Sequence, residues 1–157
     1  MSSKRGTAWL PFRSRDREHD CYEPIRWKQI AMVKFTVGGT ADVFELKAEK
    51  VVFRGSVDER EASDALRSAL EQEPEKWLRA TIDVGPRSPQ LETIFANVKA
   101  IAHVTIDHAN ERSFQVELRG GEKFGGVSPA DAFAQLKLWL NKSIEPAEKA
   151  PAAAPRP

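Results

Sequence analysis

Cysteine is almost absent from this sequence, because Cys21 is the only one among 157 residues. A single cysteine excludes a disulfide within the chain and any zinc site built from several cysteines. Long apolar stretches are also missing: the longest uninterrupted apolar run is about four residues, whereas a membrane-spanning helix needs roughly 20. These absences predict a chain without a disulfide framework and without a transmembrane helix.

An excess of charge is lacking as well, since 24 Lys and Arg stand against 23 Asp and Glu, a net charge of +1. Such a balance demands neither a nucleic acid nor an acidic partner. Apolar residues make up 41% of the chain and charged residues 30%, which predicts a folded globular protein. Near the N-terminus, the apolar stretch 8–12 is too short for a secretory signal and contains Pro11. A cytoplasmic location is therefore expected.

Three zones differ in composition. Residues 1–29 are basic and are interrupted by Pro11 and Pro24, which predicts a flexible N-terminal arm. Residues 30–144 hold all the periodic segments and are predicted to form a single globular domain. Residues 145–157 are rich in proline and alanine and cannot bury enough surface to fold, so we expect a disordered tail.

Alternating apolar residues predict six strands, at 30–37, 43–46, 51–53, 80–84, 103–108 and 113–118. The second and third are close enough to pair antiparallel, and the last two read as a hairpin. Three helix starts are predicted, one at Asp58, whose Glu61 has capping-box spacing, and two at Ser-Pro pairs beginning at Ser88 and Ser128. The second helix carries the clearest apolar stripe, formed by Leu91, Ile94, Phe95, Val98 and Ile101.

The order of these elements is β-β-β-α-β-α-β-β-α. The central β-α-β-α-β stretch, residues 51–107, predicts parallel strands joined by right-handed crossovers, with antiparallel strands on either side. The predicted fold is therefore α/β or α+β, a mixed β-sheet with three helices packed on it.

The sequence contains no complete catalytic pattern, so catalytic residues stay unassigned. No metal site is predicted, because His103 and His108 would point to opposite faces of one strand. No cofactor site is predicted either, since the glycine-rich segment 120–126 lacks the Lys-Ser/Thr pair of a phosphate-binding loop. Asp83, at the end of a predicted central strand, leaves open a small enzyme with an acid at the sheet edge.

Ser88 is a candidate phosphorylation site. A phosphate at a helix N-terminus would be stabilised by the helix dipole. The alternative is that the Ser88 hydroxyl simply caps the predicted helix.

The function that these observations favour is a non-enzymatic module, an interaction or regulatory domain whose partner is another protein. Trp77, Phe124 and Trp139 are its candidate anchors, because aromatic side chains dominate interface energetics. The sequence does not predict an oligomeric state.

The alternative function is nucleic-acid binding through the basic arm. Residues 1–34 hold eight basic and four acidic side chains, with aromatic residues between them that could stack on bases. The candidate contact residues share a basic or aromatic side chain and are Lys4, Arg5, Trp9, Arg13, Arg15, Arg17, Arg26 and Trp27.

Overall fold

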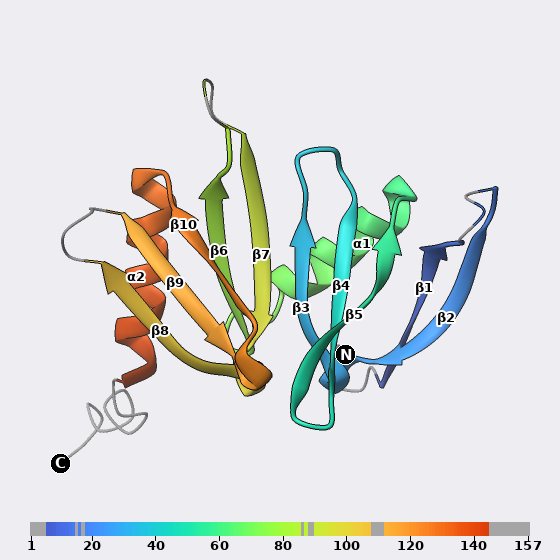
Figure 1. Ribbon diagram of the computed structural model, residues 1–157, viewed down its shortest axis with the longest axis horizontal. Coiled ribbons are helices and arrows are strands. Elements are labelled where there is room, and N and C mark those ends of the chain that lie inside the picture. The colour runs from blue at the N-terminus through green and yellow to red at the C-terminus, as the bar shows by residue number, and fades with distance from the viewer. Residues whose placement is uncertain are drawn as a thin grey trace, which may run out of the picture.

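The computed structural model describes residues 6–14, 16, 18–85, 87, 90–107 and 112–144. These residues form one seven-stranded and one three-stranded antiparallel sheet with two α-helices (Figure 1). The strands are β1 (Thr7–Arg13), β2 (Asp20–Arg26), β3 (Ile30–Phe35), β4 (Ala41–Lys47), β5 (Lys50–Val57), β6 (Trp77–Asp83), β7 (Leu91–Asn97), β8 (Ile101–Asp107), β9 (Ser113–Leu118) and β10 (Lys123–Val127). The helices are α1 (Arg60–Glu71) and α2 (Ala130–Ile144), and short 3₁₀ turns are η2 (Trp27–Gln29), η3 (Val98–Ala100) and η4 (Arg119–Gly121).

The predicted mixed sheet with three helices is wrong. The first and third predicted helices exist as α1 and α2, but the second is replaced by strand β7, turn η3 and the start of β8. All pairs of described strands are antiparallel, so the predicted parallel crossovers are absent from the described residues.

The burial of β7 on both faces explains this error. Phe95 lies in one hydrophobic core, whereas its neighbours Ile94 and Ala96 lie in the other. A strand covered on both sides does not alternate between apolar and polar residues. Its apolar positions therefore coincided with helical spacing, and periodicity alone could not separate the two structures.

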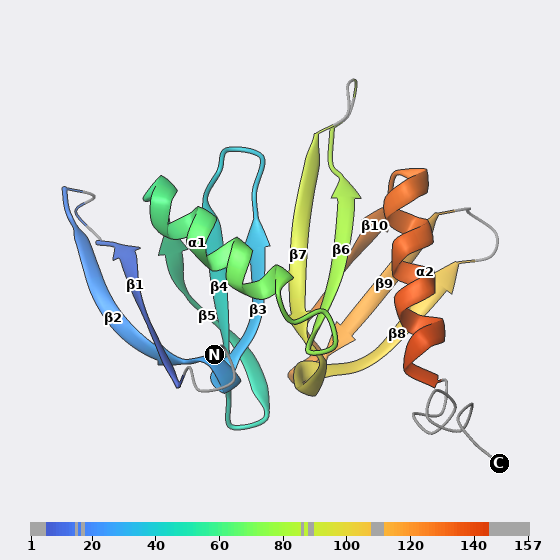
Figure 2. The same ribbon diagram turned by 180° about the vertical axis from the view of Figure 1, so that it is seen from behind.

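The chain is built from two similar units, which the sequence analysis did not detect. Each unit consists of a hairpin, a 3₁₀ turn, a three-stranded meander and a helix. In the first unit, residues 7–71, these are β1–β2, η2, β3–β4–β5 and α1. In the second, residues 77–144, they are β6–β7, η3, β8–β9–β10 and α2. Figure 2 shows α1 lying across the first meander and α2 across the second.

Details of geometry recur between the units about 70 residues apart. The first and second strands of each meander shift register at the same place, between Ile30 and Met32 and between Ile101 and His103. The last turn of each meander has two successive residues of positive φ, Ala48 and Glu49 in the first unit and two glycines in the second. The helices share apolar positions as well: Ala62, Leu66 and Leu70 correspond to Ala132, Leu136 and Leu140.

A glycine allows the hairpin to approach the meander in each unit. A Cβ at Gly55 of β5 would lie 2.7 Å from Cδ1 of Phe12 in β1. A Cβ at Gly126 of β10 would lie 2.8 Å from Cγ2 of Ile82 in β6. Both distances are too short for a carbon–carbon contact, so only glycine permits this close packing.

The two units join edge to edge through β3 and β7, where Val33 faces Phe95 and Phe35 faces Thr93. The sheet order β2-β1-β5-β4-β3-β7-β6 follows from this junction. Strand β8, which corresponds to β3, is an end strand of the three-stranded sheet, and β2, which corresponds to β7, is an end strand of the larger one.

The basic segment predicted as a flexible arm instead contributes the hairpin β1–β2 to the sheet. Backbone bonds from Ser14 to His19 and from Trp27 to Gly6 show which residue pairs of this hairpin are hydrogen-bonded. Hydrogen-bonded and non-hydrogen-bonded pairs alternate along an antiparallel ladder, so Pro11 and Pro24 fall in non-hydrogen-bonded pairs. Their nitrogen atoms therefore both point away from the β1–β2 ladder. Proline is tolerated at such positions, which is why the two prolines did not prevent strand formation.

Candidate functional site

A groove of about 800 Å³ lies between the two helices. Its floor is one face of β6 and β7, the two strands that stand between α1 and α2 in Figure 2. Side chains from the end of α1 form one wall and side chains from α2 form the other. The groove exists because the β3–β7 junction sets the units side by side and leaves this face of β6–β7 without a helix of its own.

Two arginines on the groove surface lie against phenylalanine rings. The guanidinium carbon of Arg79 is 5.6 Å from the centroid of Phe95, and that of Arg67 is 5.3 Å from the centroid of Phe35. Both arginines share one carboxylate, since Arg67 Nε and Arg79 Nη1 each lie 3.5 Å from Oε2 of Glu71. Sharing one acid leaves part of the hydrogen-bonding capacity of the two guanidinium groups available to a ligand.

Apolar side chains of α2 and β7 are exposed to the groove. Leu138 of α2 is 55% exposed and Leu91 of β7 is 47% exposed. Trp139 also lines the groove, and its indole nitrogen donates a hydrogen bond of 2.7 Å to the carbonyl of Pro74. An apolar surface beside two arginines is suited to a ligand that carries both apolar and acidic groups.

The structure places the three predicted anchors in different surroundings. Trp139 and Trp77 both line the groove, but Trp77 is buried in the first core. Phe124 packs against the ring of Phe114 in the second core. Sequence reasoning missed Leu138, although a signal existed. Leu138 is apolar but lies outside the apolar stripe of its helix, which consists of Phe133, Leu136, Leu140 and Ile144.

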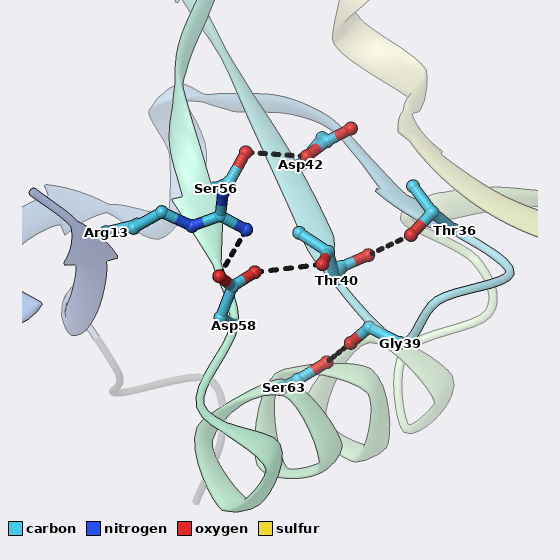
Figure 3. Close-up of polar contacts among 8 residues, drawn as sticks. All are labelled: Arg13, Thr36, Gly39, Thr40, Asp42, Ser56, Asp58 and Ser63. Atoms are coloured by element: carbon cyan, nitrogen blue, oxygen red, sulfur yellow. Dashed lines mark hydrogen bonds and ion pairs between the residues drawn. The ribbon is translucent and has the colours of Figure 1, made fainter. Parts of the chain in front are cut away.

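A polar cluster at the ends of β1, β4 and β5 has a structural role (Figure 3). Arg13 forms an ion pair with Asp58, whose carboxylate also accepts a hydrogen bond of 2.8 Å from the hydroxyl of Thr40. Ser56 donates to Asp42 at 2.7 Å beside this pair. The hydrogen bond to Asp58 raises the pKa of Arg13, so the guanidinium stays charged. These contacts fasten the first hairpin to the meander.

The same cluster corrects the predicted start of α1. Asp58 was expected to cap the helix, but the carboxylate of Glu59 accepts the hydrogen bonds from the backbone of Glu61 and Ala62. Asp58 is instead engaged with Arg13 and Thr40.

The four candidate nucleic-acid contacts that the structure describes lie in different environments. Trp9 and Arg26 are exposed, Trp27 packs against the first core, and Arg13 is held by Asp58. The other four, Lys4, Arg5, Arg15 and Arg17, lie outside the described residues. A residue absent from the prediction, Tyr22, is 61% exposed and lies on the same face of the hairpin as Trp9.

Asp83 closes a loop at the end of β6. Its carboxylate accepts hydrogen bonds of 3.0 Å from the backbone nitrogens of Gly85 and Gln90, and these bonds lower its pKa. In this geometry the carboxylate holds the backbone of Gly85 close to that of Gln90. The candidate phosphorylation site Ser88 lies outside the described residues. Within the described ranges, no group of three or more His, Cys, Asp or Glu side chains could hold a metal ion.

Comparison with protein-family models, curated proteins and solved structures finds no match for this chain. In the part of the chain that the structure describes, neither helix is long and apolar enough to cross a membrane.

Proposed function

We propose that this protein is a non-enzymatic binding module whose groove holds an apolar, acid-containing segment of another protein. The observation that carries the proposal is the groove over β6–β7 between two helices, which is lined by the exposed leucines Leu91 and Leu138 and by an arginine from each side, Arg67 of α1 and Arg79 of β6. Exposed apolar side chains gathered around a concave surface are typical of protein-binding sites.

The charges in the groove favour an acidic group on the partner. Arg67, Arg79 and Lys142 contribute three positive charges to the lining, whereas Glu71 and Asp131 contribute two negative ones. An acidic side chain of the partner would give Arg67 and Arg79 a second carboxylate. Ion pairs of this kind set the register of a partner whose affinity comes mainly from apolar burial.

A selection from a random peptide library on the full chain tests the proposal. We expect the enriched peptides to combine leucine, isoleucine or aromatic residues with at least one acid. Leu138→Glu and Arg79→Glu should each weaken their binding at least about tenfold, because one replaces an apolar contact and the other reverses a charge.

Arg26→Glu is the matched control, since Arg26 is equally basic but lies on the distant strand β2. The Arg26→Glu variant should bind the selected peptides as tightly as the unmodified protein does. Selected peptides that bind Leu138→Glu and Arg79→Glu as tightly as the unmodified protein would place the binding surface elsewhere.

Single-stranded nucleic acid is the second candidate ligand, favoured by one observation. Trp9 and Tyr22, 63% and 61% exposed, are diagonal neighbours on one face of the β1–β2 hairpin. Exposed aromatic side chains side by side can stack on successive bases.

Point variants test this second candidate, since deletion of the N-terminal residues would remove β1 from the sheet. A labelled single strand should bind at low salt and lose affinity when Trp9 and Tyr22 are both replaced by alanine, while Leu138→Ala should leave binding unchanged. Absence of binding at low salt would exclude nucleic acid as the ligand and leave protein binding in the groove as the proposed function.

A further inference from the structure

We propose that the protein forms a symmetric homodimer in which strand β8 pairs antiparallel with β8 of a second copy. The proposal is independent of the groove and concerns the edge of the three-stranded sheet. It follows from the comparison of the two units, because the corresponding strand of the first unit, β3, is covered by β7.

The inner side chains of β8 are less buried than those of β3. In the first unit, Val33 and Phe35 of β3 are almost fully buried. Their counterparts in β8, Val104 and Ile106, belong to the second core but are only partly buried. A further strand beside β8 would extend this core just as β7 extends the first one.

The backbone of β8 is also suited to a further pairing. The backbone hydrogen bond from Ser128 to the carbonyl of Arg112 determines which residues of β9 direct their backbone amide and carbonyl groups toward β10. The backbone groups of the residues between them are directed toward β8. By this alternation, the amide and carbonyl groups of Val104 and Ile106 point away from β9, toward the open edge. The described part of β8 contains no proline or lysine of the kind that protects edge strands.

The sequence of β8 is self-complementary around Thr105. In the register that places Thr105 opposite its own copy, Val104 faces Ile106 of the second copy and His103 faces Asp107 of the second copy. Val104 and Ile106 would then exchange both backbone hydrogen bonds, while their side chains meet on the core side of the sheet. His103 and Asp107 pair opposite charges on the outer face when His103 is protonated; Nε2 of His103 already lies 3.2 Å from Oε1 of Glu117.

The opposite end of the molecule disfavours an open polymer. Repetition of the β3–β7 pairing between copies would place Val104 of β8 opposite Pro24 of β2. Because the nitrogen of Pro24 points to the open edge and carries no hydrogen, that ladder would lose a central hydrogen bond. The β8–β8 contact is isologous and closes at two copies.

Sedimentation equilibrium of the full chain from about 1 to about 300 micromolar tests the proposal. We expect reversible dimers, and Thr105→Lys should raise the dissociation constant at least about tenfold, because two lysines would face each other at the two-fold axis. The matched control is Gln115→Lys, which adds the same charge to an exposed position on the neighbouring strand β9.

A cysteine variant gives a second readout that does not depend on the strength of association. In a Cys21→Ser background, Thr105→Cys should form a disulfide-linked dimer on mild oxidation, since residues at a two-fold axis of this kind lie within disulfide distance. Gln115→Cys should form much less. Monomers throughout the concentration range, dimers insensitive to Thr105→Lys, or equal cross-linking of both cysteine variants would overturn the proposal.

Discussion

Single residues decide how closely the elements of each unit approach one another. Gly55 and Gly126 admit the hairpin, and Pro24 occupies the outer edge of the sheet without disturbing its inner ladder. In a sequence, glycine and proline ordinarily indicate turns and flexible segments. Their positions in strands could not be predicted, because the reason for them lies in residues distant along the chain, such as Phe12 and Ile82.

Gly55→Ala should destabilise the protein by about 1–3 kcal/mol, because the added Cβ would overlap the ring of Phe12 in a packed core. The free energy of unfolding, measured with urea, checks this value. Gly38→Ala is the control: nothing lies within 4 Å of its Cβ position, so its effect should be small. Equal stability of both variants would contradict the close approach of β1 to β5.

Asp83→Asn should lower the melting temperature at pH 7 by weakening two hydrogen bonds from the backbone to a carboxylate. The hydrogen bonds lower the folded-state pKa of Asp83 below the usual aspartate value of about 3.9. The contribution of the carboxylate is therefore present above that pH and is lost as pH falls through the folded-state pKa. The difference in melting temperature should accordingly narrow below about pH 4.

Asp64→Asn, on the exposed side of α1, is the control for Asp83→Asn and should have little effect at either pH. A difference for Asp83→Asn that is the same at pH 7 and at low pH would contradict an ionised Asp83 held by Gly85 and Gln90.

At the scale of elements, local pattern was sufficient for exposed hairpins and for amphipathic helices. The pairing of β4 with β5 was predicted from the short connection between them, and the pairing of β8 with β9 from their alternating apolar residues. Helix α2 was predicted from Ser128-Pro129 and its apolar stripe. Strand β7 was mistaken for a helix because both of its faces are buried. Of the predicted anchors, Trp77 and Trp139 line the groove, but the groove itself could not be predicted, because its floor depends on the arrangement of distant strands.

Replacement of Phe95 by alanine in β7 should cost about 3–5 kcal/mol, the usual range for a fully buried phenylalanine. Its ring packs edge-to-face against Phe35 at 5.8 Å across the junction of the two units. Leu91→Ala, in the same strand but exposed, should cost less than about 1 kcal/mol. Denaturant unfolding of both variants checks the contrast, and a cost below about 1 kcal/mol for Phe95→Ala would mean that the junction is not packed as described.

At the scale of the whole molecule, two copies of one unit share a sheet through β3 and β7. The repeat was invisible to the sequence analysis because few identities survive between the copies, and those that do are common core residues such as leucine and alanine. The junction creates the groove by leaving one face of β6–β7 between the helices. Among the described residues, β8 pairs with β9 alone, whereas β3 of the first unit pairs with both β4 and β7. Both proposals therefore depend on the junction.

The most direct test of this arrangement is a disulfide across the junction. Lys34 of β3 lies opposite Ile94 of β7 in the register of the two strands. Backbone bonds at both ends of the β6–β7 hairpin show that this is a non-hydrogen-bonded pair, in which Cα atoms lie about 4.5 Å apart, within the range for a disulfide.

The measurement is the yield of the 34–94 disulfide, determined by peptide mass spectrometry, in a Lys34→Cys, Ile94→Cys protein that also carries Cys21→Ser. We predict nearly complete cross-linking under native conditions and loss of selectivity in denaturant. The pair Lys34→Cys and Arg79→Cys, with Arg79 on β6 and on the opposite face of the sheet, should remain largely reduced. Absence of the 34–94 disulfide in folded protein, or equal yields from the two pairs, would contradict the joining of the two units through β3 and β7.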